Sequence, residues 1–162
     1  MTTKKTGFGS FLRAAVPVAV ILVALVVLIN ALASGRTAPV PSAFAAGASL
    51  DEAVVRAREE GRVVFAVATA DWCGPCQSYK RGALANERVA SWLEANGAPV
   101  VIDVTSGPTP VSDRLAVTQI PASFVINGAG EVVARWTGEL SASELRERLD
   151  ASKAMARSLL HL

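Results

Sequence analysis

Hydrophobic and polar positions divide the chain into one long apolar run and a series of shorter, periodic segments. The long run contains no charged residue between Arg13 and Arg36. About 20 helical residues rise roughly 30 Å, which is the thickness of the hydrocarbon core of a bilayer. We therefore predict a single N-terminal transmembrane helix, a signal-anchor, over residues 14–33.

The flanks of this run predict its orientation. Three basic residues lie in the tail 1–13 and only Arg36 closely follows the run, so the positive-inside rule keeps the tail in the cytoplasm and exports the rest. A cleaved signal peptide is the alternative, because residues 31–33 (Ala-Leu-Ala) offer a small-x-small site. The run exceeds the 7–15 residues of a typical signal-peptide core, which favours an uncleaved anchor. Residues 34–48, rich in Pro, Ala and Gly, predict a tether.

After the tether, helical and strand patterns alternate. Ser49 and Glu52 form a capping box that begins a helix, and Ser141 and Glu144 form another. The turn "NGAG" between two apolar runs predicts a β-hairpin. Helices are expected over 49–60, 75–81, 86–97 and 141–160, and strands over 62–70, 99–105, 122–127 and 131–138. This order predicts an α/β layered domain with a mixed central β-sheet over residues 49–162.

Charge excludes one class of partner. All 14 acidic residues lie at or after Asp51, and from Ser49 on they face 12 basic ones, so the domain itself is slightly acidic. The overall charge of +2 therefore belongs to the N-terminal tail and not to a domain face. We expect no nucleic-acid partner. The sequence also contains no flavin or nicotinamide motif, so we expect no cofactor.

Both cysteines lie in "ADWCGPCQSYK", residues 70–80. Cys73 directly follows a predicted buried strand and a helix is expected from about Pro75, so Cys73 meets a helix N-terminus. Free N–H groups and the helix dipole favour a thiolate there. Cys76 lies one turn further, close enough to attack a mixed disulfide at Cys73. The spacing predicts a dithiol/disulfide switch with Cys73 as nucleophile and Cys76 as resolving cysteine.

Two other interpretations of the cysteine pair are weaker. A zinc site needs two further ligands, and the single histidine, His161, lies next to the C-terminus. A structural disulfide across so short a loop removes little chain entropy and stabilises little. We therefore expect no metal site.

Three motifs in order resemble the thioredoxin family. "WCGPC", residues 72–76, matches its active-site motif, and Ile120-Pro121, 45 residues after Cys76, fits its cis-proline loop. "NGAGEVVARWTG", residues 127–138, matches the hairpin that follows. Within the family, the chain is most similar to the exported C-terminal thioredoxin-like domain of the membrane disulfide reductase DsbD. The resemblance implies a thioredoxin-like three-layer fold.

The resemblance also implies site residues and partners. Trp72, Ile120 and Pro121 would contact the substrate, while Gly74 and Pro75 would tune the redox-active Cys73-Cys76 disulfide. Because no His stands between the cysteines, we favour a monomeric reductase of protein disulfides, in the periplasm or outside the cell, supplied with electrons by a membrane reductase. A disulfide oxidant or isomerase is one alternative. A thioredoxin-fold client-binding or assembly factor is another.

The chain departs from the family where a carboxylate handles protons. The buried aspartate usual six residues before the first cysteine is Val67 here, and its lysine partner corresponds to Val101. The acid that DsbD-like domains carry seven residues after that cysteine is Lys80. These changes leave open which group assists deprotonation of Cys76. In the segment 104–117 we identify no chemistry.

Overall fold

The computed structural model describes residues 17, 19–29 and 37–159, and the chain divides after Thr37 into two compact units. Residues 17 and 19–29 are helical and exposed. Among the residues described, no helix has the length and apolarity needed to cross a bilayer. The tail 1–13 and much of the predicted anchor lie outside the described residues, so the anchor over 14–33 stays a prediction.

The centre of the second unit is a four-stranded sheet in the order β2-β1-β3-β4. β1 pairs in parallel with β2, whereas β3 is antiparallel to both β1 and β4. The strands are β1 (Val63–Thr69), β2 (Gly97–Asp103), β3 (Ala122–Ile126) and β4 (Val132–Thr137). Every residue of β1 is buried, which explains its continuous apolar sequence. The predicted mixed sheet and its terminal hairpin are confirmed.

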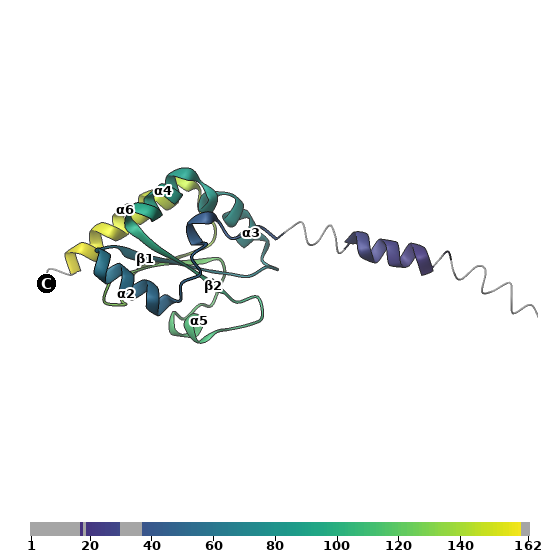
Figure 1. Ribbon diagram of the computed structural model, residues 1–162, viewed down its shortest axis with the longest axis horizontal. Coiled ribbons are helices and arrows are strands. Elements are labelled where there is room, and N and C mark those ends of the chain that lie inside the picture. The colour runs from purple at the N-terminus through teal and green to yellow at the C-terminus, as the bar shows by residue number, and fades with distance from the viewer. Residues whose placement is uncertain (1–16, 18, 30–36, 160–162) are drawn as a thin grey trace, which may run out of the picture. The chain divides into compact units, whose positions relative to one another are not determined.

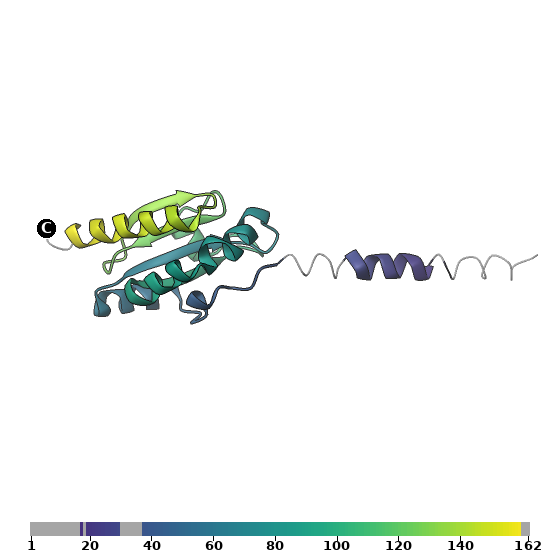
Figure 2. The same ribbon diagram turned by 90° about the horizontal axis from the view of Figure 1, so that it is seen from above.

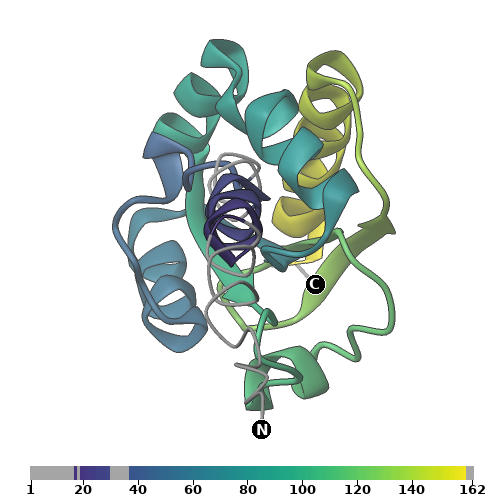
Figure 3. The same ribbon diagram turned by 90° about the vertical axis from the view of Figure 1, so that its right-hand side faces the viewer.

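Helices cover both faces of this sheet. The second unit contains the α-helices α2 (Leu50–Glu60), α3 (Gly74–Arg81), α4 (Glu87–Asn96), α5 (Pro110–Arg114) and α6 (Ala142–Leu159), and the 3-10 helices η1 (Ser42–Phe44) and η2 (Ala83–Ala85). α2 and α5 pack on one face, and α3, α4 and α6 on the other. Figure 3 shows α6 above the sheet and α5 below it, and Figure 2 shows α4 beside α6. The three-layer architecture is confirmed.

The helix ends follow the capping signals. The Ser49 backbone N–H donates to the Glu52 carboxylate at 2.9 Å, and the Glu52 N–H donates back to the Ser49 hydroxyl at 3.3 Å. Gly61 closes α2 with a φ of 65°, which glycine adopts without a Cβ penalty. Gly97 ends α4 as its C-cap residue, as predicted, and is also the first residue of β2, in an extended conformation.

The segment expected to be a tether packs on the domain from Ala38 onward. Phe44 is only 3% exposed, and its ring centroid lies 6.0 Å from that of Phe65 in β1. The Ala38 N–H donates to the side-chain oxygen of Gln77 at 2.6 Å. This differs from the expected spacer over 34–48, because one large aromatic ring can fix a segment whose composition otherwise indicates coil.

Candidate active site

The cysteines lie where the central strand β1 gives way to α3, at one end of the domain (Figure 1). Cys73 is the N-cap residue of α3, and the Cys76 N–H donates to its sulfur at 3.2 Å. Pro75 occupies the first turn, where its missing N–H leaves no hydrogen bond unmade. Cys73 thus sits at a helix N-terminus, as predicted, with α3 beginning at Gly74.

The two sulfurs form a disulfide, with an S–S distance of 2.03 Å. Both cysteines are buried, Cys73 at 6% exposure and Cys76 at 1%. Ala70, Val104 and Ile120 pack against them. The sulfur of Cys76 is therefore the more enclosed one, and what surrounds it governs its protonation.

Thr105 holds the loop before Cys73, although the sequence analysis found no chemistry in its segment. Its hydroxyl accepts the Asp71 N–H at 2.9 Å, and its carbonyl accepts the indole N–H of Trp72 at 3.1 Å. Asp103 in turn accepts the Thr105 N–H at 2.8 Å. The hydrogen bond from the Thr105 hydroxyl lowers the pKa of Asp103, and the nearby charge of Lys80 contributes to the shift. An Asp two residues before a Thr after a buried strand is a recognisable turn signal.

Gln77 is a second site residue that the sequence analysis missed. Its side-chain amide donates to the carbonyls of Ala70 at 2.9 Å and Asp71 at 3.3 Å, while its oxygen accepts the Ala38 N–H. The side chain is buried, so these bonds replace its contact with water. Gln77 therefore joins the loop before the cysteines to the segment that enters the domain. A polar residue four positions after Cys73, on the buried side of α3, was the available signal.

Ile120 and Pro121 face the cysteines from the loop before β3. Their peptide bond is cis, as predicted from the motif. Ile120 packs against the disulfide, and Pro121 lines the same small cavity as Cys76. The Pro121 carbonyl accepts the Gly138 N–H at 2.8 Å. The structure therefore brings together residues 73, 76, 120 and 121, which are distant in sequence.

An open groove lies beside the disulfide. Trp72, 69% exposed, forms one border and Ile120 another, and the groove encloses about 230 Å³. Further lining comes from Val104, Pro108 and Val117. The lining is mostly apolar, which suits an extended peptide segment, and the substrate-binding role of Trp72 and Ile120 stays a prediction.

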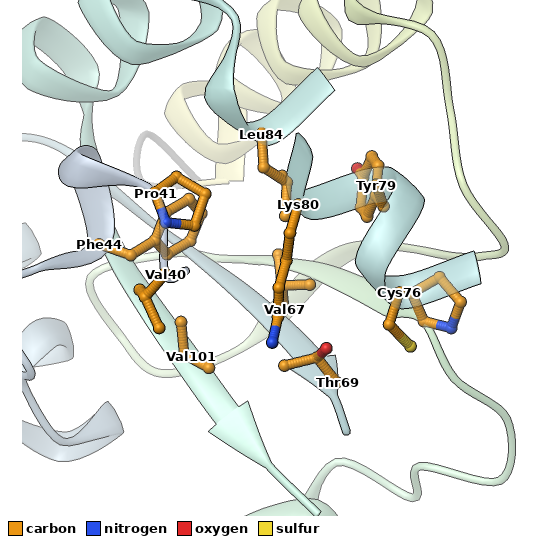
Figure 4. A pocket seen from close by; sticks show the side chains of 11 residues that line it. Val40, Pro41, Phe44, Val67, Thr69, Cys76, Tyr79, Lys80, Leu84 and Val101 are labelled. Atoms are coloured by element: carbon orange, nitrogen blue, oxygen red, sulfur yellow. The ribbon is translucent and has the colours of Figure 1, made fainter. Parts of the chain in front are cut away.

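Lys80 lies behind the disulfide, with only 7% of its side chain exposed. It shares a cavity of about 10 Å³ with Cys76, Thr69, Val67 and Val101 (Figure 4). Val67 and Val101 are partners in the β1–β2 register. Among the described residues that line this cavity, none is a carboxylate. The positions that carry proton-handling groups in related domains here hold two valines and a lysine.

A metal site has no support in the part of the chain that the structure describes. No three His, Cys, Asp or Glu side chains gather closely enough there to hold an ion. His161 lies outside the described residues.

A dithiol at the N-terminus of a helix that follows a central strand, with a cis-proline facing it, defines a thioredoxin-type redox site. The model of the thioredoxin-like domain family matches residues 50–153, and the chain belongs to this family. With the Cys73–Cys76 disulfide in place, it is a thiol-disulfide oxidoreductase. A search of curated protein sequences finds no significant match.

Solved structures agree on the fold. The solution structure of a thioredoxin from Thermus thermophilus is 25% identical, with a TM-score of 0.55 over 62% of this chain and 81% of that one. The DsbH oxidoreductase superposes with a TM-score of 0.60 at 16% identity, over 73% of this chain and 88% of its own. The oxidised C-terminal domain of DsbD from Neisseria meningitidis gives 0.55 at 22% identity, over 64% and 92%.

Proposed function

We propose that this protein reduces disulfides in other proteins outside the cytoplasm, with Cys73 as nucleophile and Cys76 as resolving cysteine. The observation that carries the proposal is the disulfide at the start of α3, with the outer sulfur accepting a backbone N–H of that helix. A helix N-terminus stabilises the thiolate that attacks.

The reaction proceeds in two exchanges. The Cys73 thiolate attacks a client disulfide, forms a mixed disulfide with one client sulfur and releases the other as a thiolate. Cys76 then loses its proton and attacks the Cys73 sulfur. The Cys73–Cys76 disulfide forms, the second client thiolate leaves, and both client thiolates take protons from solvent. Two electrons pass from the dithiol to the client, so a membrane reductase must return two electrons to the oxidised protein.

Gly74 and Pro75 support the reducing direction. Neither residue between the cysteines carries a charge, so the Cys73 thiolate gains stabilisation from the helix without an added cation from this dipeptide. A less stabilised thiolate corresponds to a less oxidising disulfide. A chain with a potential near −120 mV, about that of strong periplasmic oxidants, would instead be an oxidant.

The location outside the cytoplasm is part of the proposal. It rests on the uncharged run between Arg13 and Arg36 and on the excess of basic residues before it. The anchor over 14–33 would keep the domain at the membrane from which its electrons come.

Covalent trapping in cells tests the proposed function. Cys76→Ser should accumulate mixed disulfides between Cys73 and its clients, because the resolving attack is lost. The matched control Cys73→Ser should trap little, because Cys76 is 1% exposed. Equal trapping by both variants would contradict the assigned roles. Trapping by neither would favour a client-binding or assembly factor.

A further inference from the structure

Lys80 is a charged residue enclosed behind the disulfide, and we propose that it is a positioning residue whose ammonium group stabilises the Cys76 thiolate while a client is released. The inference rests on the proposed function, because it concerns the second of the two exchanges. It assigns a catalytic purpose to a buried charge whose one ion pair among the described residues is the long contact with Asp71.

The burial of Lys80 calls for compensation that the fold supplies only in part. Lysine is almost never fully buried unless it is paired. The Lys80 ammonium lies 3.7 Å from a carboxylate oxygen of Asp71, beyond the distance of a charge-assisted hydrogen bond. The Asp71 side chain is 53% exposed, so water shares its charge. Lys80 therefore keeps much of its field available to other groups.

The end of the Lys80 side chain points toward Thr69, which lies between it and Cys76 in this view (Figure 4). The Thr69 hydroxyl is buried and has no hydrogen-bond partner among the described atoms. All three residues line the cavity of about 10 Å³, which is close to the volume needed by one water molecule. Bulk water is therefore largely excluded, and charges interact more strongly there than in solvent.

The other titratable groups around Lys80 do not cancel its effect on Cys76. On α3, burial raises the pKa of Tyr79 by more than the contact of its hydroxyl with Ser123, at 3.4 Å, lowers it, so the phenol stays neutral. Asp71 lies 3.7 Å from Lys80, and the charge of Lys80 helps to lower the pKa of Asp103, but both carboxylates are exposed and neither lines the cavity. Within the described lining of the cavity, Lys80 is the one basic side chain, and no carboxylate lies there.

This arrangement favours the resolving step specifically. In the mixed disulfide, Cys76 is a buried thiol, and burial alone disfavours its anion. A fixed positive charge offsets that cost, so the thiol gives its proton to solvent base more readily and the thiolate attacks the Cys73 sulfur. Lys80 itself exchanges no proton in this step. Once the Cys73–Cys76 disulfide forms and the client thiolate leaves, Cys76 carries no charge.

The test measures resolution against pH. The reduced full chain is mixed with an aromatic disulfide whose thiolate absorbs visible light, and stopped-flow absorbance follows two releases. The first reports attack by Cys73, and the second reports attack by Cys76. Lys80→Met removes the charge and keeps the length, Lys80→Arg keeps the charge, and Arg56→Met removes an exposed charge on α2 as the matched control.

In Lys80→Met the pH midpoint of the second release should rise, while Lys80→Arg and Arg56→Met stay near the parent. Each unit of rise leaves about tenfold less thiolate at neutral pH. The greater nucleophilicity of a more basic thiolate, with a Brønsted coefficient of about 0.4–0.5, reduces the loss of rate to about threefold. Above both midpoints, Lys80→Met should be about threefold faster than the parent for the same reason.

The pH profiles of the second release in Lys80→Met and in the parent should therefore cross. A merely structural role of Lys80 would not produce this crossing. An unchanged midpoint in folded Lys80→Met, or an equal loss at every pH, would overturn the inference. Failure of the first release in the parent would instead contradict the proposed function. A second measurement keeps Lys80 and uses Cys73→Ser, in which Cys76 is the remaining cysteine. The absorbance of the Cys76 thiolate should titrate at or below the ordinary cysteine pKa of about 8.5. A higher value would also overturn the inference.

Discussion

Replacing Phe44 with alanine should destabilise the domain strongly, even though this residue lies in a stretch whose composition predicts a tether. The ring is 3% exposed and packs against Phe65, which itself stacks on Trp136 with ring centroids 6.1 Å apart. Truncating a buried Phe to Ala typically costs about 3–5 kcal/mol. Phe44 belongs to a three-residue helix at the edge of the fold, which can detach and limit the loss. We therefore expect about 3 kcal/mol.

Urea unfolding of the full chain in mild detergent, followed by tryptophan fluorescence, measures this change. For a domain of this size, 3 kcal/mol corresponds to a fall in melting temperature of roughly 12 °C. Val55→Ala, at a 51% exposed position of α2, is the matched control and should change the free energy of unfolding by about 0.5 kcal/mol at most. A loss below about 1 kcal/mol for Phe44→Ala would show that the segment from Ala38 to Phe44 does not pack on the domain in solution.

Two further predictions concern the loop before the cysteines and the membrane. Thr105→Val removes the hydroxyl that accepts the Asp71 N–H, so it should lower the free energy of unfolding by about 1–2 kcal/mol and weaken trapping by Cys76→Ser. Ser91→Ala, at an exposed position of α4, is its control, and equal behaviour of the two would contradict the role of Thr105. The full chain should remain with membranes washed at alkaline pH and keep its N-terminal residues. A soluble product that begins near Ser34 would establish a cleaved signal peptide.

The arrangement of strands and helices could be predicted because its signals are local. The continuous apolar sequence of β1 indicates burial on both faces, and Ser49 with Glu52 marks the start of α2. The turn before β4 was evident from "NGAG". In each case, neighbouring residues determine the structure, so one sequence suffices.

The surroundings of the cysteines could be predicted only in part. The motif and its spacing identified Cys73, Cys76 and the proline loop, because these depend on one helix turn and on resemblance. The contacts of Gln77 and the burial of Lys80 depend on segments far away in the chain, which no local pattern reports. Phe44 was missed for the same reason, since the ring packs against β1 rather than against its own neighbours.

The two outer strands of the sheet bear on how this protein avoids aggregation. An edge strand exposes unpaired backbone groups to any extended chain, and unfolded clients offer many. β2 carries Pro99, which has no N–H to donate. β4 is short, pairs with β3 through a register shift near Ile126, and places Arg135 over the ring of Phe124, 5.0 Å from its centre. Proline, irregular pairing and charge are the devices that protect natural sheets from joining edge to edge. The sheet is therefore protected against taking up additional strands, and pairing of a client backbone at Ile120, which stays a prediction, would not compete with pairing at the sheet edges.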